Sequence, residues 1–316
     1  MNQLTFDQVK LASNRLLNYI VKTPLISDQK LNEELGAQIF LKMENQQKTN
    51  SFKARGAFNS ILAYREKYGK FPDKIVAQSS GNHAQAIACA AKEFNIPALI
   101  YMITKASPVK IAATRSFGAE VILLEKRSEV NKAAEEKQKE GYVFIHPNDG
   151  DDIILGQATA AFEALLEIGE VDAIFAPCGG GGLLSGCYLA SLGLSPKAQT
   201  FACEPLSAND AARSFRLGEI VGYQDTPNTI ADGARTLEVL PQSFSYLQKL
   251  AGFFEISEEE IIFWQKKLSE MLKQKIEPTS ALTVAGIKQY LQKNPQNSQT
   301  KNQKLLAIIS GGNVVA

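Results

Sequence analysis

The sequence has almost no net charge, few cysteines and no long apolar run, and each absence excludes a class of protein. Its 34 Lys and Arg nearly balance 33 Asp and Glu, so we expect no partnership with nucleic acid or with a membrane. The four cysteines follow no CxxC or paired spacing, which favours buried reduced thiols and a cytoplasmic protein. The apolar runs are far shorter than a membrane span, and the first residues do not have the pattern of a signal peptide.

The 316 residues are 45% hydrophobic and 21% charged, which indicates a globular chain with two lobes rather than one. Strand-like and helix-like segments alternate in two series, which predicts parallel sheets covered by helices. The strands expected in these series are 75–77, 98–102, 121–124, 142–145, 173–175, 200–202, 253–256 and 305–309. We predict an α/β fold in which residues 1–70 and 149–316 form a large cofactor-binding domain and residues 71–148 a small inserted α/β domain.

The stretch Thr49–Ala57 joins a strand-like run to a helix-like run and places Lys53 in the first helical turn, directly after Phe52. A lysine that attacks a carbonyl to form a Schiff base needs partial desolvation and a fixed position. The alternative is a solvated helix lysine beside a core phenylalanine. This stretch alone favours that alternative, and three further stretches favour the reactive lysine.

Residues 78–85 form the second of these stretches and join a strand to a helix. Hydroxyls, an amide and an imidazole gather there, from Ser79, Ser80, Asn82 and His83. The N-terminus of a helix presents free N–H groups and a positive partial charge, which suits a carboxylate. An ordinary helix cap explains the stretch equally well.

The third stretch consists of the consecutive glycines Gly179, Gly180, Gly181 and Gly182, which follow a strand and open a helix. Without Cβ atoms, several backbone N–H groups can converge on one phosphate. The stretch is neither a P-loop nor the spaced glycine motif of dinucleotide sites. A flexible loop is the alternative.

Ser310 follows the last expected strand, at the edge where open α/β sheets bind ligands. Together the four stretches call for a cofactor with a carbonyl for the lysine, a phosphate for the glycines and a ring nitrogen for a hydroxyl. Pyridoxal phosphate has all three groups.

The chain resembles the fold-type II pyridoxal-phosphate enzymes and, within them, the serine/threonine dehydratase and serine racemase branch, which includes threo-3-hydroxyaspartate dehydratases. The resemblance extends from residue 23 to residue 313. The motifs that carry it are Ser51-Phe52-Lys53-Ala54-Arg55-Gly56-Ala57, Ser79-Ser80-Gly81-Asn82-His83-Ala84-Gln85, the tetraglycine, Glu204-Pro205, Ile230-Ala231-Asp232-Gly233, Glu277-Pro278-Thr279 and Ser310-Gly311-Gly312-Asn313. Ser280 stands where this family frequently has glycine.

The resemblance assigns a role to each matched residue. It implies that Lys53 forms the Schiff base and acts as a base, that Phe52 packs on the cofactor ring, and that Gly179–Gly182 hold the phosphate. Asn82 would bind the phenolic oxygen and Ser310 would face the pyridine nitrogen. The substrate carboxylate would be held at the stretch formed by Ser79, Ser80, Asn82 and His83. Ser80 also matches the serine that serves the opposite face of Cα in racemases.

The resemblance further implies a site for Mg²⁺, or for Ca²⁺ or Mn²⁺, within residues 204–210. Glu204 and Asp210 would supply carboxylates and Ala208 its backbone carbonyl, an all-oxygen set that suits such ions. Without the resemblance, two solvated acids are the favoured explanation. A homodimer is also expected from the resemblance alone.

The function expected from these observations is an ammonia-lyase that converts L-serine, L-threonine or 3-hydroxyaspartate to a 2-oxo acid and ammonia by β-elimination. The alternative is a serine or other amino-acid racemase with side elimination, which depends on Ser80. A 3-hydroxyaspartate substrate needs a cation for its second carboxylate, and Arg235 is the candidate. A non-catalytic phosphate- or nucleotide-binding module is a third interpretation, against which Lys53 argues.

Overall fold

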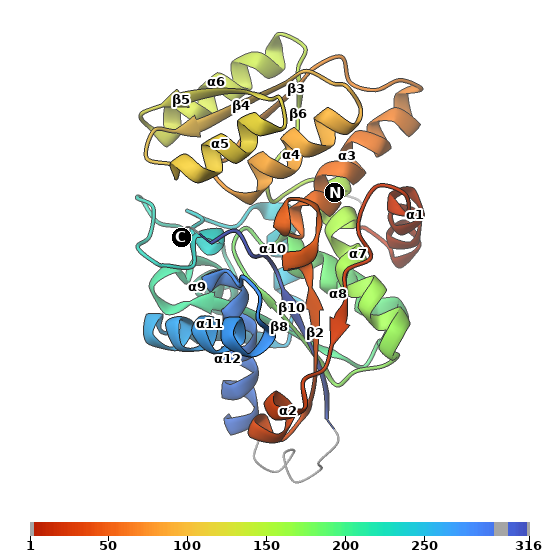
Figure 1. The fold of residues 1–316 in the computed structure, drawn as a ribbon, viewed down its shortest axis with the longest axis vertical. Coiled ribbons are helices and arrows are strands. Elements are labelled where there is room, and N and C mark those ends of the chain that lie inside the picture. The colour runs from red at the N-terminus through yellow and green to blue at the C-terminus, as the bar shows by residue number, and fades with distance from the viewer. Residues whose placement is uncertain (1–2, 294–302, 315–316) are drawn as a thin grey trace.

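Two β-sheets organise the chain, as the computed structural model of residues 3–293 and 303–314 shows (Figure 1). The larger sheet has the strand order β1-β2-β10-β7-β8-β9 and the smaller has the order β5-β4-β3-β6. All strand pairs in both sheets are parallel except β1 with β2. Helices flank both sheets, which confirms the predicted fold class.

The strands of the larger sheet are β1 Leu25–Ile26, β2 Gln38–Met43, β7 Ala173–Pro177, β8 Gln199–Pro205, β9 Gly252–Ile256 and β10 Lys304–Ile309. Those of the smaller sheet are β3 Ile75–Gln78, β4 Ala98–Ile103, β5 Glu120–Leu124 and β6 Val143–Phe144. The smaller sheet is thus inserted in the sequence between β2 and β7 of the larger one. The exact boundaries at residues 71 and 148 stay a prediction.

The helices surround these sheets in two groups, one on each sheet (Figure 1). They are α1 Phe6–Leu16, α2 Gln29–Leu35, α3 Lys53–Tyr68, α4 Asn82–Glu93, α5 Pro108–Ser116, α6 Arg127–Lys139, α7 Asp151–Ile168, α8 Gly182–Leu194, α9 Asp210–Leu217, α10 Pro241–Leu247, α11 Glu258–Leu272 and α12 Pro278–Lys293. In the part of the chain that the structure describes, no helix combines the length and the apolar character that a membrane crossing requires.

Burial explains why the central strands read as continuous apolar runs. Every residue of β7, and every residue of β10 after Lys304, is buried, as expected for parallel strands covered on both faces. Parallel pairing also brings the carboxyl ends of β2, β10 and β7 to the same edge of the sheet. The lysine stretch, Ser310 and the glycine loop follow these three strands, so the topology collects them at one edge.

Three local details differ from the expectations. The strand β1 and the helix α10 were not predicted, because two residues of strand and a seven-residue helix are too short to show a period. The helix-like run that the sequence suggests from Ser51 toward Tyr64 begins at Lys53. Ser51, which is extended, instead forms an isolated bridge with Gly311. The Phe52 N–H donates to the Ser310 carbonyl at 3.0 Å, and Phe52, with helical backbone angles, caps the helix.

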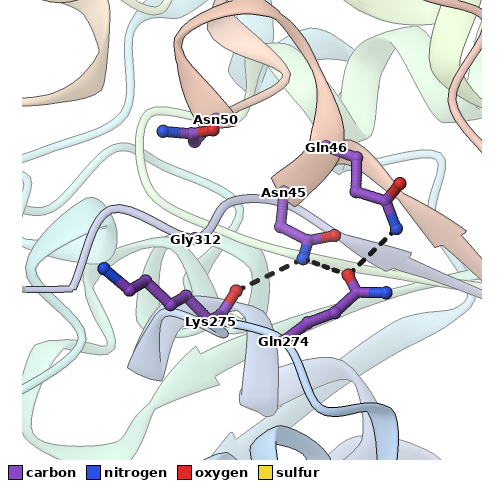
Figure 2. Close-up of a pocket in the computed structure, with 6 residues that line it drawn as sticks. All are labelled: Asn45, Gln46, Asn50, Gln274, Lys275 and Gly312. Carbon is purple, nitrogen blue, oxygen red and sulfur yellow. Dashed lines mark hydrogen bonds between the residues drawn. The ribbon is translucent and has the colours of Figure 1, made fainter.

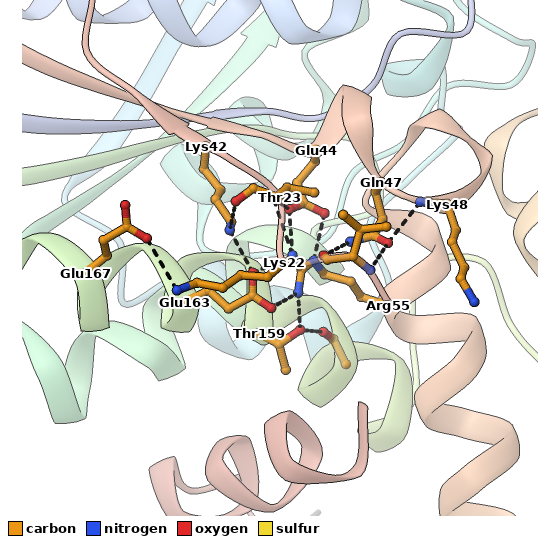
Figure 3. Close-up of polar contacts among 12 residues, drawn as sticks. Lys22, Thr23, Lys42, Glu44, Gln47, Lys48, Arg55, Thr159, Glu163 and Glu167 are labelled. Carbon is orange, nitrogen blue, oxygen red and sulfur yellow. Dashed lines mark hydrogen bonds and ion pairs between the residues drawn. The ribbon is translucent and has the colours of Figure 1, made fainter. Parts of the chain in front are cut away.

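A buried network of charges fixes the first turn of α3 (Figure 3). The Arg55 guanidinium lies 2.7 Å from a Glu44 oxygen and 2.8 Å from a Glu163 oxygen, and the Lys42 amino group lies 2.7 Å from Glu163. The Thr23 hydroxyl donates to Glu44 at 2.6 Å. Two cations and two anions therefore balance inside the protein and connect β2, α3 and α7.

The backbones of α3 and α7 also touch directly at two glycines. A Cβ on Gly156 would lie 2.6 Å from the Arg55 carbonyl oxygen and 2.8 Å from the Gly56 Cα. Neither glycine has positive φ, so space and not backbone freedom requires glycine at position 156. This contact and the charge network set where Lys53 begins its helix.

Replacement of Arg55 by Met should destabilise the protein by about 3–5 kcal/mol, because Glu44 and Glu163 would remain buried without their main cation. Denaturant unfolding of the cofactor-free chain measures this loss. As a control, Lys70→Met removes one partner of the exposed pair with Asp73 and should leave the unfolding midpoint unchanged. A loss as small as that of the control would show that the network is not important for stability.

Candidate active site

Lys53 is enclosed between two loops. Its Nζ donates to the Pro147 carbonyl at 2.5 Å and to Asn148 Oδ1 at 2.8 Å, and it lies 5.1 Å from the centre of the Phe52 ring. Part of the side chain is exposed, but burial of the amino group lowers the pKa of Lys53 to about 7. A substantial fraction of Lys53 is therefore the free amine at neutral pH, which is the nucleophilic and basic form.

The two histidines near Lys53 carry no charge at neutral pH. Burial, followed by the charge of Lys53, lowers the pKa of His83 to about 3 and that of His146 to about 4. His83 Nε2 donates to the Ile145 carbonyl at 3.0 Å, and its Nδ1 has no hydrogen-bond partner within the described residues. His83 can therefore offer a neutral acceptor to a substrate group, but not a positive charge.

The four glycines form a packed loop. A Cβ would collide at each position, 2.8 Å from the Gly233 carbonyl at Gly179, 2.5 Å from the Asn148 side chain at Gly180, 3.0 Å from Ser243 at Gly181, and against the Asn148 carbonyl at Gly182. Gly181 also has a φ of 86°, which other residues rarely adopt. A side chain at any of these positions would thus contact its neighbours too closely, and glycine is the residue that fits.

The N–H groups of the glycine loop donate no hydrogen bond to the part of the chain that the structure describes. Among the described residues, no hydrogen bond is donated by the backbone nitrogens of residues 179–182, although Gly182 opens the 13-residue helix α8. Free N–H groups at the positive end of a helix bind phosphate well. The loop therefore fits the phosphate of the predicted cofactor.

Ser310 lies beside the lysine stretch at the carboxyl end of β10. It is buried, and its hydroxyl lies 3.1 Å from that of Ser280. Ser280, which stands where the family frequently has glycine, also bonds to the backbone of Gly311. The unusual serine therefore orients the predicted ring-nitrogen partner rather than removing it.

Asn82 is held by two residues whose roles were not predicted. Its Nδ2 donates to the two oxygens of Glu277 at 2.8 and 3.1 Å, and its Oδ1 accepts from Asn313 Nδ2 at 3.0 Å. Burial, and then the charge of Asp232, raises the pKa of Glu277 to about 7. Glu277 and Asn313 together fix which end of the Asn82 amide faces the site. Both belong to motifs noted in the sequence, but a partner 195 residues away leaves no local signal.

The two serines of the second stretch follow β3. Ser79 Oγ accepts from the Gly81 N–H and Ser80 Oγ from the Ile103 N–H, both at 3.2 Å. Each hydroxyl therefore keeps its own hydrogen free to donate. Asn148, which contacts both Lys53 and the glycine loop, is a further site residue that sequence reasoning missed. Its position after β6 in His146-Pro147-Asn148 was the available signal.

Glu204, Ala208 and Asp210 lie apart from Lys53, at the carboxyl end of β8 and the start of α9. Glu204 accepts from the N–H groups of Ala211 and Ala212 at 3.3 and 2.9 Å, whereas neither buried oxygen of Asp210 has a hydrogen-bond partner among the described residues. Burial raises the pKa of both carboxyl groups, that of Asp210 to about 7. No cluster of three or more His, Cys, Asp or Glu side chains suited to a metal occurs in the described ranges, but two acids with a carbonyl fit a hard cation.

A polar pocket of about 450 Å³ is lined in part by Asn50 of the lysine stretch (Figure 2). None of the predicted site residues lines it. Its lining is Asn45, Gln46, Asn50, Gln274, Lys275 and Gly312. The pocket is thus separate from the enclosed amino group of Lys53.

The pKa of Lys53 predicts how this residue reacts with a small aldehyde in the cofactor-free chain. Its labelling rate should rise through about pH 7 and then level off, because only the neutral amine is a nucleophile and a lowered pKa makes it available at lower pH. Reductive trapping followed by peptide mass spectrometry measures the rate. In the chain unfolded by denaturant, the midpoint should move to about pH 10.4. The same midpoint in both states would contradict the burial of the amine.

Comparison with known proteins agrees with the geometry of the site. The family model described as pyridoxal-phosphate dependent enzyme matches residues 16–311. The chain is 41% identical to L-threo-3-hydroxyaspartate ammonia-lyase of Saccharomyces cerevisiae, over 98% of this chain and 93% of that protein. It is 40% identical to serine racemase of Schizosaccharomyces pombe, over 98% and 94%.

Solved structures show the same fold. The crystal structure of serine racemase from Dictyostelium discoideum matches with a TM-score of 0.90 and 36% identity, over 99% of both chains. Residues that could hold the phosphate, the carbonyl and the ring of the cofactor are all present in the site described above. The chain therefore belongs to the pyridoxal-phosphate-dependent enzymes, in the branch of ammonia-lyases and racemases, as the sequence predicted.

Proposed function

We propose that this enzyme is an ammonia-lyase for 3-hydroxyaspartate, which it converts to a 2-oxo acid and ammonia. Two arginines, one from each lobe, are the residues that favour this substrate over other β-hydroxy amino acids. Arg127 begins α6 beside the smaller sheet and Arg235 follows the 3-10 turn Asp232–Ala234. Both are exposed.

The two guanidinium groups lie close enough to repel each other. Although Arg127 is exposed to solvent, nearby protein atoms partly desolvate its guanidinium group and lower its pKa, and the positive charge of Arg235 lowers it further. Neither arginine forms an ion pair with a carboxylate in the described parts of the chain. Two unpaired cations on facing lobes favour an anion between them, and guanidinium groups bind carboxylates well.

Arg235 is also close to the glycine loop. Its neighbours contact Gly179, since a Cβ there would lie 2.8 Å from the Gly233 carbonyl, 3.4 Å from Ala234 and 3.6 Å from Thr236. A carboxylate bound by the arginine pair would thus lie near the cofactor site. This supports a substrate with a carboxylate on its side chain, as in the name of the yeast relative.

The residues of the site would hold pyridoxal phosphate through the glycine N–H groups, Ser310 and Asn82. When bound, the cofactor supplies a carbonyl that condenses with amines and a ring that stabilises negative charge at the substrate Cα. Lys53, a free amine at neutral pH, accepts the Cα proton. The β-hydroxyl leaves as water, and the later uptake of one water releases the 2-oxo acid and ammonia.

Replacement of Arg235 by Ala should reduce kcat/KM for L-threo-3-hydroxyaspartate about tenfold or more, the effect of losing one charge-assisted contact. The kcat/KM for L-serine, which lacks the second carboxylate, should change by less than about twofold. Release of 2-oxo acid from both substrates measures this, with Arg127→Ala tested in parallel. The exposed Arg115, on α5, gives a control variant, Arg115→Ala, that should affect neither substrate. Equal losses on both substrates would refute the role of the pair.

Racemisation is the second candidate function, because Ser80 lies at the end of β3 with its hydroxyl hydrogen free. Chiral chromatography of the same reactions detects it. If D-serine formed from L-serine at a rate comparable to elimination, the enzyme would be a racemase. Ser80→Ala should then abolish the D-enantiomer and spare the 2-oxo acid.

We also propose that Glu204, Asp210 and the Ala208 carbonyl bind a divalent cation such as Mg²⁺. The support is chemical, since both buried oxygens of Asp210 have no hydrogen-bond partner among the described residues and a second carboxylate lies near. Two negative charges confined in one buried place are costly unless a cation balances them. The homodimer and the cytoplasmic location stay predictions from the resemblance and the composition.

Removal of divalent cations with EDTA should lower the melting temperature of the enzyme by several degrees, and added Mg²⁺ should restore it, because a ligand of the folded state stabilises it. Thermal unfolding followed by circular dichroism measures this. In Asp210→Asn the response to Mg²⁺ should disappear, whereas Asp73→Asn, at an exposed position, should keep it. An unchanged melting temperature in EDTA would refute the cation site.

A further inference from the structure

Gln157 carries a buried amide with no hydrogen-bond partner. It lies on α7 and is 1% exposed, and neither its Oε1 nor its Nε2 has a partner in the described chain. Burial of an unpaired amide disfavours the folded state, and buried polar groups almost always have partners. We therefore expect the hydrogen-bond partner of this amide to come from a bound molecule.

The amide lies between the lysine helix and the glycine loop. A Cβ on Gly182 would lie 2.9 Å from Gln157 Oε1, and a Cβ on Gly56 would lie 3.3 Å from Gln157 Nε2. Glycines let α7 approach both α3 and α8 closely. On the α8 side, for example, a Cβ on Gly186 would lie 2.6 Å from the Ala158 nitrogen of α7. Gln157 on α7 thus lies next to the first turn of α3 and the first turn of α8.

Among the side chains that face Gly180, Gly181 and Gly182, only the amide of Gln157 lacks a hydrogen bond in the described chain; the Thr236 hydroxyl, beside Gly179, also has none. Asn148, which faces Gly180, accepts from Lys53, and Ser243, which faces Gly181, donates to Asp149 at 3.4 Å. Gln157, which faces Gly182, has no such bond. Because no hydrogen bond fixes the orientation of its amide, the NH₂ group is free to turn toward the loop.

We propose that the amide of Gln157 donates a hydrogen bond to the phosphate of pyridoxal phosphate and so completes the site formed by the glycine N–H groups. The proposal rests on the cofactor assigned above and adds a side-chain donor to it. The backbone N–H groups and the α8 dipole supply the other favourable contacts. A neutral amide suits this place, because it binds an anion but needs no counter-ion when the site is empty.

A Gln157→Met variant tests the proposal through two quantities that should change in opposite directions. Methionine is close in volume but has no unpaired amide, so the melting temperature of the cofactor-free chain should stay the same or rise. The dissociation constant of pyridoxal phosphate, followed by absorbance, should increase about tenfold or more, as for the loss of one hydrogen bond to a charged acceptor. The dissociation constant of pyridoxal, which lacks the phosphate, should not change.

The control variant is Gln47→Met, at another buried glutamine whose amide does have partners, the backbone N–H and carbonyl of Val21. It should lower the melting temperature and leave the affinity for pyridoxal phosphate unchanged. If Gln157→Met did not fold, Gln157→Glu would replace it, and a carboxylate beside the phosphate should weaken binding of pyridoxal phosphate more than that of pyridoxal.

Three results would overturn the proposal. They are an unchanged affinity for pyridoxal phosphate, an equal loss of affinity for pyridoxal and pyridoxal phosphate, and a destabilised cofactor-free chain with normal affinity. The last would make Gln157 a structural residue. If the wild-type chain did not bind pyridoxal phosphate at all, the cofactor assignment itself would fail, which is a different result from unchanged affinity in the variant.

Discussion

The contact between α3 and α7 is the constraint on which the site depends. Lys53 is the first residue of α3, and its position follows from where that helix can lie. Gly156 lets the two backbones touch, and Arg55 joins α3 to the buried Glu44 and the largely buried Glu163 through ion pairs. A flexible lysine so close to solvent would keep its proton. Held in this way, it loses its hydration and becomes a free amine.

The electrostatics of the site are arranged around that amine. Burial lowers the pKa of both nearby imidazoles well below that of Lys53, so they are weaker bases and do not compete with Lys53 for a proton. Anion binding is instead left to neutral donors, namely the glycine N–H groups at the start of α8, two serine hydroxyls and an asparagine. In the proposed arrangement, neutral donors would bind the phosphate, and Lys53 would stay available as an uncharged amine.

Arg127, on α6 beside the smaller sheet, and Arg235, in the larger lobe, lie near enough for the charge of Arg235 to lower the pKa of Arg127. Lys110 and Asp232 form an ion pair across the boundary between the two lobes. The larger sheet therefore carries the cofactor groups, and the smaller sheet brings serines and one arginine over them. In the function proposed above, selection among substrates depends on this boundary, and the reaction depends on groups of the larger sheet.

The sequence alone determined the parallel α/β fold, the reactive lysine and the glycine loop. Continuous apolar strands, strand–helix alternation and four adjacent glycines involve residues that are close together in the chain, so they can be recognised from the sequence. Only the tertiary structure decided which distant residues contact these site residues. Glu277 meets Asn82 across 195 residues, Asn148 reaches Lys53 across 95, and Gln157 and Arg127 look like ordinary helix residues until α7 and α6 are placed. The reason is physical, since burial, lowered pKa and unpaired amides arise from packing between distant segments, and no spacing along the chain records them.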